Sequence, residues 1–295
     1  MNDLFTSYQL SILFINFSLA IAAICATRII LGMVTGVNST SELSKRDNFA
    51  FGISVAGGAL AIATILLATL SGESAATLTQ EVGNITGYLV GGIVCLVGGM
   101  MFNDLVIFNQ LSLKNAIKEQ NISAGIVQGA TMLALGIMIA NGMDWEPTGD
   151  ITEAYIILPI LVVSLFILFL VSKFRALIYK KRNGGKSLQQ ALANCNSALA
   201  IRYAGHLVGT ALAIGASSGV VTYLNADKVT SLLNWALVAI VITVVISPLS
   251  MLARKFVLPG INVSQEVDEQ ENIGIASIEA VIFIAIGLVF KGLAG

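Results

Sequence analysis

The sequence predicts an all-α fold: a polytopic membrane bundle of eight transmembrane helices, built from two parallel four-helix repeats that each consist of two hairpins. Three observations support this class. Hydrophobic residues make up 56% of the 295-residue chain and charged residues only 11%, with a mean hydropathy of +0.86. The apolar residues fall into runs long enough to cross a bilayer. One short motif then recurs at the start of every second run.

Each predicted span contains about 20 mainly apolar residues, the number that crosses the hydrocarbon core of a bilayer. The first run has no basic residue before it and is too long for a signal-peptide core, so we expect a retained helix. The first and fifth spans are bulky and are expected to face lipid, with the even-numbered spans inside. In order, the spans are 9–35, 48–70, 84–108, 121–142, 152–174, 196–219, 229–253 and 272–292.

Basic residues predict the orientation of these spans. They gather in the connections after odd-numbered spans, as with Lys45, Lys114, Lys255 and the run KFRALIYKKRNGGK at 173–186. The connections after spans 2 and 4 have none, and the one after span 6 has only Lys228. Because Lys and Arg are retained on the cytoplasmic side, we expect a multi-pass protein with both termini outside the cytoplasm.

The recurring motif is an asparagine followed by small residues four and eight positions later. Asparagine is a good N-cap because its side chain accepts a hydrogen bond from a free amide of the first helical turn. Small residues four apart lie on one face and let membrane helices approach closely. The motif therefore predicts a two-span hairpin used four times. The four predicted caps are Asn48, Asn121, Asn196 and Asn272.

Longer similarity joins the two halves of the chain, which predicts two repeats at 1–147 and 148–295. Each half has an even number of spans, so both should have the same orientation and be related by an axis along the membrane normal. The aligned segments are 48–63 with 196–211 and 121–141 with 272–292.

These residues resemble a family of small bacterial inner-membrane proteins known only as domain of unknown function 350. The resemblance is carried by Asn48 with AFGISVAGGALAIATILLATLSG, by LSLKNAIKEQNISAG at 111–125, and by their counterparts at 196–219 and 258–276. It spans nearly the whole chain as two tandem copies. It implies a bacterial inner-membrane location, dimers among single-copy members and, for some relatives, an association with membrane stress. No established activity comes with it.

Two opposite charges are predicted to lie at matching depth in the second half. Arg202 and Glu279 are about 9 and 10 Å from the starts of their helices by helical rise. Their counterparts in the first half are Ser54 and Gln128, both neutral, so the charges are present together or absent together. We therefore expect Arg202 to contact Glu279, and the exchange of both charges to be tolerated better than the loss of one. Snorkelling of Arg202 to the head groups is the alternative.

His206 is the only histidine and lies about 15 Å from its helix start, near the bilayer midplane. It shares a helix face with Arg202, four residues away. One interpretation is a neutral imidazole that hydrogen-bonds to a neighbouring helix. The other is a proton-responsive group in a polar path.

Two functions remain open at this level. The first is a non-enzymatic membrane-stress scaffold or partner subunit that binds membrane lipids, a cytoplasmic protein or a second copy of itself. The second is an ion or proton channel or transporter that uses a buried Arg202–Glu279–His206 group. We expect no enzyme, cofactor, metal site or nucleic-acid binding, since ligand sets and basic balance are lacking. The candidate lipid or partner contacts are Lys173, Arg175, Lys180, Lys181, Arg182 and Lys186, for which enforcement of topology is the alternative role.

Overall fold

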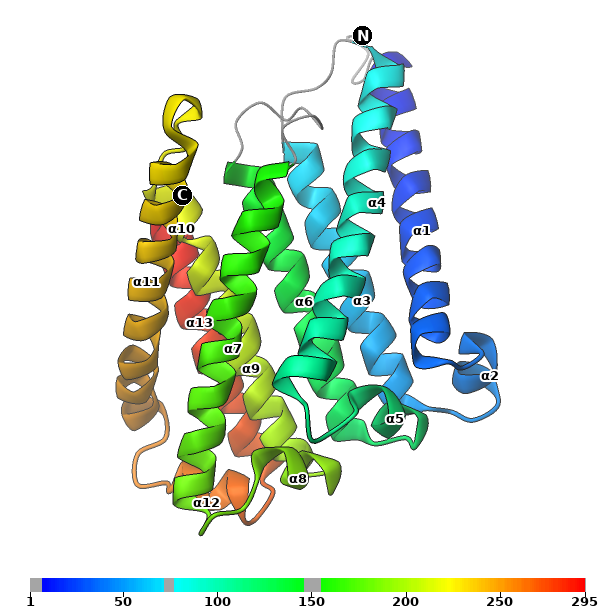
Figure 1. Cartoon of the computed structure of the whole chain (residues 1–295). Helices are drawn as coiled ribbons and strands as arrows, with labels where there is room; N and C mark the ends of the chain where they lie inside the picture. The colour runs from blue at the N-terminus through cyan, green and yellow to red at the C-terminus, as the bar shows by residue number, and fades with distance from the viewer. Residues whose placement is uncertain (1–6, 72–76, 146–154, 295) are drawn as a thin grey trace, which may run out of the picture.

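The computed structural model describes residues 7–71, 77–145 and 155–294, and every regular element in these ranges is a helix (Figure 1). Eight of the described helices are long and apolar enough to cross a membrane, which confirms the predicted fold class. They are α1 (Ser7–Thr35), α3 (Phe49–Ser71), α4 (Leu78–Phe102), α6 (Ile122–Trp145), α7 (Ile157–Arg182), α9 (Ser197–Gly215), α11 (Lys228–Val257) and α13 (Ile273–Ala294).

Most predicted boundaries agree with the structure to within a few residues. The largest difference is in α7, which continues to Arg182 instead of ending at residue 174. Short elements extend other spans: η1 (Asn103–Ile107) continues α4, α10 (Ser217–Val220) follows α9, and η3 (Asn225–Asp227) precedes α11. The predicted repeat boundary at 147/148 lies outside the described residues.

Four six-residue helices precede the even-numbered spans and were missed from the sequence. All four lie at one end of the bundle (Figure 1), which we call the basic end. Each is followed by a residue with positive φ immediately before the asparagine of the next span, so the chain reverses sharply there. The short helices are α2 (Ser39–Ser44), α5 (Leu113–Lys118), α8 (Leu188–Ala193) and α12 (Val263–Asp268).

All four motif asparagines cap their spans. Each Oδ1 accepts a hydrogen bond from the backbone N–H three residues later, at distances of 3.0, 3.0, 2.7 and 3.2 Å for Asn48, Asn121, Asn196 and Asn272. Two of them also reach a neighbouring hairpin. Asn48 Nδ2 donates to the carbonyl of Ile117 at 2.9 Å, and Asn121 Nδ2 donates to two carbonyls of α8. The caps therefore link successive hairpins as well as starting helices.

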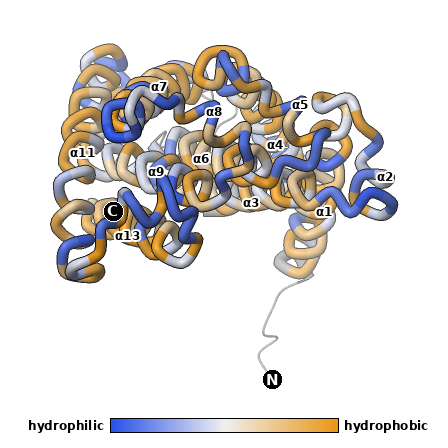
Figure 2. Tube along the Cα trace, turned by 90° about the horizontal axis from the view of Figure 1, so that it is seen from below, coloured by the Kyte–Doolittle hydropathy of each residue, from blue (hydrophilic) through white to orange (hydrophobic). Residues whose placement is uncertain are grey.

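The even-numbered spans form a row in the order α3, α6, α9, α13. The most extensive contacts between helices are α3 with α6, α9 with α13, and α6 with α9. Figure 2, viewed from the basic end, shows α13, α9, α6 and α3 following one another from left to right. The two central helices are the most enclosed, with 78% of the α6 span and 89% of the α9 span buried, against 39% for α3 and 33% for α13.

Small residues set the close spacing inside this row. A Cβ on Gly57 of α3 would overlap the backbone of Gly129 on α6. At the equivalent place in the second repeat, a Cβ on Gly205 of α9 would overlap the backbone of Ala280 on α13. Backbones that approach this closely gain dispersion contacts along their whole length, which is how helices associate in lipid. The α3–α6 contact and the α9–α13 contact are thus the same contact between successive hairpins, used once in each repeat.

The order of the row defines how the repeats meet. A two-fold axis between the halves would bring α3 against α9 or α6 against α13, and neither pair makes an extensive contact in the described ranges. Instead, the last span of the first repeat packs against the first even-numbered span of the second. The copies share one orientation, as expected, but they follow one another head to tail. We call the α6–α9 contact the internal junction.

Candidate functional site: a buried charged pocket in the second repeat

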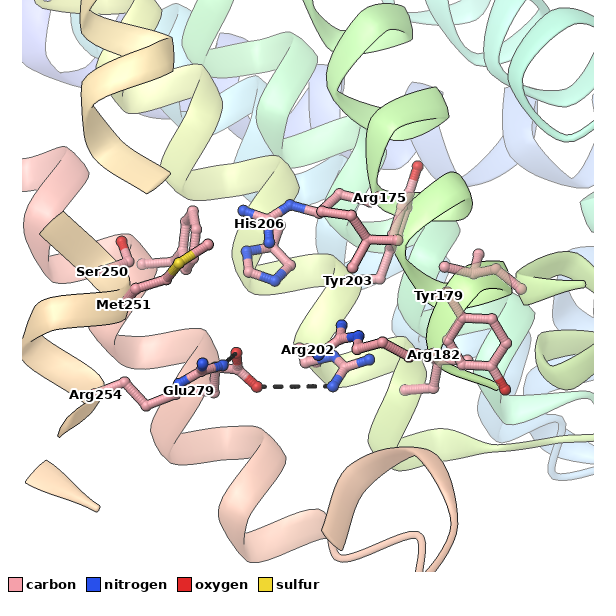
Figure 3. Close-up of a pocket in the computed structure, with 14 residues that line it drawn as sticks. Arg175, Tyr179, Arg182, Arg202, Tyr203, His206, Ser250, Met251, Arg254 and Glu279 are labelled. Carbon is pink, nitrogen blue, oxygen red and sulfur yellow. Dashed lines mark hydrogen bonds and ion pairs between the residues drawn. The ribbon is translucent and has the colours of Figure 1, made fainter. Parts of the chain in front are cut away.

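A pocket near the basic end brings together several charged side chains of the second repeat (Figure 3). It has a volume of about 70 Å³ and lies between α7, α9, α11 and α13. A cavity of this size holds more than one water molecule. Its ionisable lining residues are Arg175, Tyr179, Arg182, Arg202, Tyr203, His206, Arg254 and Glu279.

Arg202 is held inside the bundle and does not extend to the surface. The residue is 5% exposed and forms an ion pair with Asp268 of α12. Its Nη1 also lies 3.9 Å from Oε2 of Glu279 on α13. The structure therefore brings together the two charges singled out in the sequence, and it adds Asp268 as the closer partner of the guanidinium.

Glu279 is shared between two arginines. It is 6% exposed, and its Oε1 accepts a hydrogen bond from Nη1 of Arg254 on α11 at 3.0 Å. Asp268, Arg202, Glu279 and Arg254 thus form a chain of alternating charges, which we call the charged network. Two cations and two anions balance, so the cost of removing each charge from water is offset by its neighbours.

Two residues of the basic run at 173–186 line the pocket. Because α7 stays helical to Arg182, Arg175 and Arg182 lie on the face that lines the pocket. The Arg175 guanidinium lies 4.8 Å from the ring centroid of Phe283, and Arg182 donates a hydrogen bond to Ser264. Lys173 lies over the ring of Phe169, with 5.4 Å between Nζ and the ring centroid, and Lys180, Lys181 and Lys186 are exposed.

His206 contacts an aromatic ring on the neighbouring helix α13. Its imidazole meets Phe283 edge to face, with 3.9 Å between ring centroids and an interplanar angle of 89°. Its Nδ1 has no hydrogen-bond partner among the described residues. Arg175 Nε and Glu279 Oε2 are likewise buried without such a partner in the described part of the chain. Buried polar atoms of this kind are usually satisfied by ordered water.

The equivalent place in the first repeat is an apolar cavity. Ser54 and Gln128 both line it, together with Asp104 and Lys114, and its volume is about 390 Å³. Ser54 Oγ donates to the carbonyl of Ala50 at 3.0 Å, whereas Gln128 Nε2 has no partner within the described ranges. The charged network thus belongs to one repeat only, although both repeats keep the hollow that surrounds it.

An apolar cluster lies beyond the pocket, toward the opposite end of the bundle. Ala213, Ile246 and Phe283 form its buried part, and Ile242, Ile286 and Phe290 pack around them. These residues come from α9, α11 and α13, the helices that also carry the charged network. Their positions along the three helices place this cluster directly past His206, so the polar surface of the pocket ends there.

Sequence reasoning missed Asp268 and Arg254, and it missed that Arg175 and Arg182 line the pocket. One signal could have found the last two: Arg175, Tyr179 and Arg182 recur at the spacing of one helix face. The signal was obscured because this face lies past the predicted end of the span. No comparable pattern marks Asp268, which reaches Arg202 only because α12 folds back against α9.

Fold and pocket define a class of protein: a multi-pass membrane protein of two tandem helical repeats with a buried charged group. The chain belongs to the family described as Domain of Unknown Function (DUF350), whose pattern matches twice, over residues 4–143 and 150–294. It is also similar to a UPF0719 transmembrane protein from Aquifex aeolicus (strain VF5), with 23% identity over 130 residues, or 43% of this chain and 48% of that protein. The chain therefore spans about half the length of this relative. No solved structure matches the chain.

Proposed function

We propose that this chain is a non-enzymatic scaffold of the bacterial inner membrane that holds a cytoplasmic partner protein at its basic end. The four short helices form a polar layer at that end, and exposed Lys180, Lys181 and Lys186 lie beside it. Positive charge is retained on the cytoplasmic side of membranes, which supports a cytoplasmic basic end and both termini outside. Clustered lysines at this level attract anionic lipid or acidic protein segments. A role in membrane stress, implied by the family resemblance, fits such a scaffold.

The observation that carries this proposal is the end of the polar pocket at an apolar cluster. An ion that entered from the basic end would meet Ala213, Ile246 and Phe283 just beyond His206. Crossing that layer would remove the ion from the charged lining of the pocket, which costs several kcal/mol or more. Tight backbone contacts along the row, as at Gly205 and Ala280, leave no second route between α9 and α13. Both features favour a static structural role over permeation.

The scaffold role is tested by capture of a partner from native membranes. Lys180→Glu with Lys181→Glu reverses two exposed charges beside the charged pocket, and Lys45→Glu with Lys255→Glu is the matched control at the same end. We expect a specific cytoplasmic protein to be captured by the wild type and the control but lost from the first variant. Equal capture by all three chains, or no partner at all, would contradict the proposal. Labelling of Lys186→Cys by an impermeant maleimide only from the cytoplasmic side tests the orientation.

One observation favours a second candidate, an ion or proton channel or transporter. Glu279 Oε2 and His206 Nδ1 are both buried without hydrogen-bond partners among the described residues, next to a cavity that can hold water. Intramembrane ionisable groups of this kind often lie on proton or ion pathways. A proton leak through reconstituted liposomes that Glu279→Gln abolishes supports this function. Liposomes as tight as protein-free controls support the scaffold.

A further inference from the structure

The two ends of the row expose the same helix faces that pack together at the internal junction. At this junction the last span of one repeat, α6, meets the first even-numbered span of the next, α9. Among the described residues, α3 packs against α6 on one side and has no α6-like neighbour on its other side, and α13 likewise has no α9-like neighbour beyond it. A head-to-tail contact of this type does not close on itself as a two-fold contact does.

Equivalent positions on α3 and α9 show that the free face of α3 is a junction face. Leu60 on α3 is 55% exposed, whereas its counterpart Val208 on α9 is 7% exposed. Ala63 is exposed and its counterpart Ala211 is fully buried. The α3 face equivalent to the junction face of α9 is therefore also made of small and apolar residues, but on α3 it is exposed.

The same comparison holds for α13 and α6. Leu288 on α13 is 54% exposed, and its counterpart Ile137 on α6 is 8% exposed. Ala285 is exposed where Ala134 of α6 is fully buried. Lipid would also suit these apolar faces, so exposure alone identifies no partner. The partner is identified by the internal junction, where the equivalent faces of α9 and α6 already pack against each other within the chain.

Polar contacts and the flanking helices follow the same pattern. At the internal junction Asn121 Nδ2 donates to the carbonyls of Leu192 and Ala193, at 3.1 and 2.9 Å. Its counterpart Asn272, at the free end, makes one side-chain amide bond within the described residues, to Glu266. In addition, 39% of the α7 span is buried but only 11% of the α1 span, because α7 packs against the preceding repeat.

We propose that α13 of one chain packs against α3 of a second copy, which repeats the internal junction between chains and continues the row in the plane of the membrane. Each added chain again exposes one α3 face and one α13 face. The row therefore grows beyond two chains until it closes into a ring or is capped. This assembly does not depend on the scaffold role proposed above, since it requires no cytoplasmic partner.

Disulfide cross-linking in native membranes tests the contact. At the internal junction a Cβ on Gly215 would touch the side chain of Asn141, and the equivalents of these residues at the free ends are Leu67 and Gly292. Leu67 is 67% exposed, and a Cβ at Gly292 would have no heavy atom within 4 Å. The test chain carries Leu67→Cys and Gly292→Cys, with the native residues Cys25, Cys95 and Cys195 replaced by alanine.

Oxidation of this chain should give a ladder of dimers, trimers and larger species, and neither single variant should. The matched control pairs Leu67→Cys with Leu233→Cys, on the exposed side of α11 near the same end of the bundle. Adding Ala285→Trp should remove the ladder by blocking the α13 face, whereas Val244→Trp on the exposed side of α11 should leave it intact. Monomers only, an equal ladder from the control, or dimers from Leu67→Cys alone would overturn the proposal.

Discussion

The charged network makes an asymmetric prediction about which partner of Arg202 matters more. Arg202→Met removes the guanidinium and keeps an apolar side chain of similar length. Glu279 then still has Arg254 at 3.0 Å, whereas Asp268, whose side chain is 2% exposed, keeps no ion pair within 4 Å among the described residues and one side-chain hydrogen bond, from the Asn183 amide at 3.1 Å. Leaving a buried charge unpaired costs about 3–5 kcal/mol, so we expect Arg202→Met to reduce the free energy of unfolding by about that amount.

A second substitution, added to Arg202→Met, shows which partner of Arg202 accounts for the loss in the free energy of unfolding. Adding Asp268→Asn removes the stranded charge and should restore about 2–3 kcal/mol, the upper range for directly contacting residues. Adding Glu279→Gln should restore less than about 1 kcal/mol, because the Arg202–Glu279 distance is 3.9 Å and Asp268 stays unpaired. Unfolding of all variants in mixed detergent–SDS micelles gives both coupling free energies. Equal couplings would refute the reasoning, and a cost below about 0.5 kcal/mol for Arg202→Met would show that the guanidinium reaches the head groups.

Two further predictions concern the row and its caps. Gly205→Leu should lower the free energy of unfolding by about 1–3 kcal/mol, because the new side chain meets the backbone of Ala280. The control Gly91→Leu has no atom within 4 Å of its Cβ and should change the free energy of unfolding by less than about 0.5 kcal/mol. The same micelle unfolding experiment measures both. Asn121→Ala should lower the free energy of unfolding by about 1–2 kcal/mol, because it removes the cap of α6 and two hydrogen bonds to α8. The control is Asn115→Ala, at an exposed position in α5. A loss for Asn121→Ala no greater than for this control would contradict the capping role.

Composition and run length were sufficient to predict eight membrane-spanning helices, because the bilayer imposes a length and polarity on every span. The Asn-small-small motif identified the starts of the even-numbered spans and two glycines that meet backbone, Gly125 and Gly129. It did not mark Gly57 or Gly205, which stand one position after the last small residue of the motif. The head-to-tail order could not be predicted in this way. A motif shows that a face is suited to close packing, but all four helices carry it, so the sequence does not say which face meets which.

The charged pocket shows a similar limit. Internal comparison of Arg202 and Glu279 with Ser54 and Gln128 predicted that the two charges lie together, since depth along a helix follows directly from residue number. It also led to the expectation that exchanging both charges is better tolerated than losing one. Asp268 changes that expectation, because it stays buried and unpaired after both exchanges. The contact of Asp268 with Arg202 depends on the short helix α12, which folds back against α9. Hydrophobic periodicity does not predict such a fold-back.

The central claim is that the repeats meet head to tail through α6 and α9. An intramolecular disulfide between Asn141→Cys and Gly215→Cys, in a cysteine-free chain with a protease site inserted between the repeats, tests it most directly. After cleavage the two halves should migrate together without reductant. The control pair is Leu67→Cys with Gly215→Cys, at equivalent positions that a two-fold arrangement would bring face to face. This pair should leave the halves separate. The protein is diluted in lipid so that cross-links between chains are excluded. Linkage through the second pair and not the first would contradict the claim.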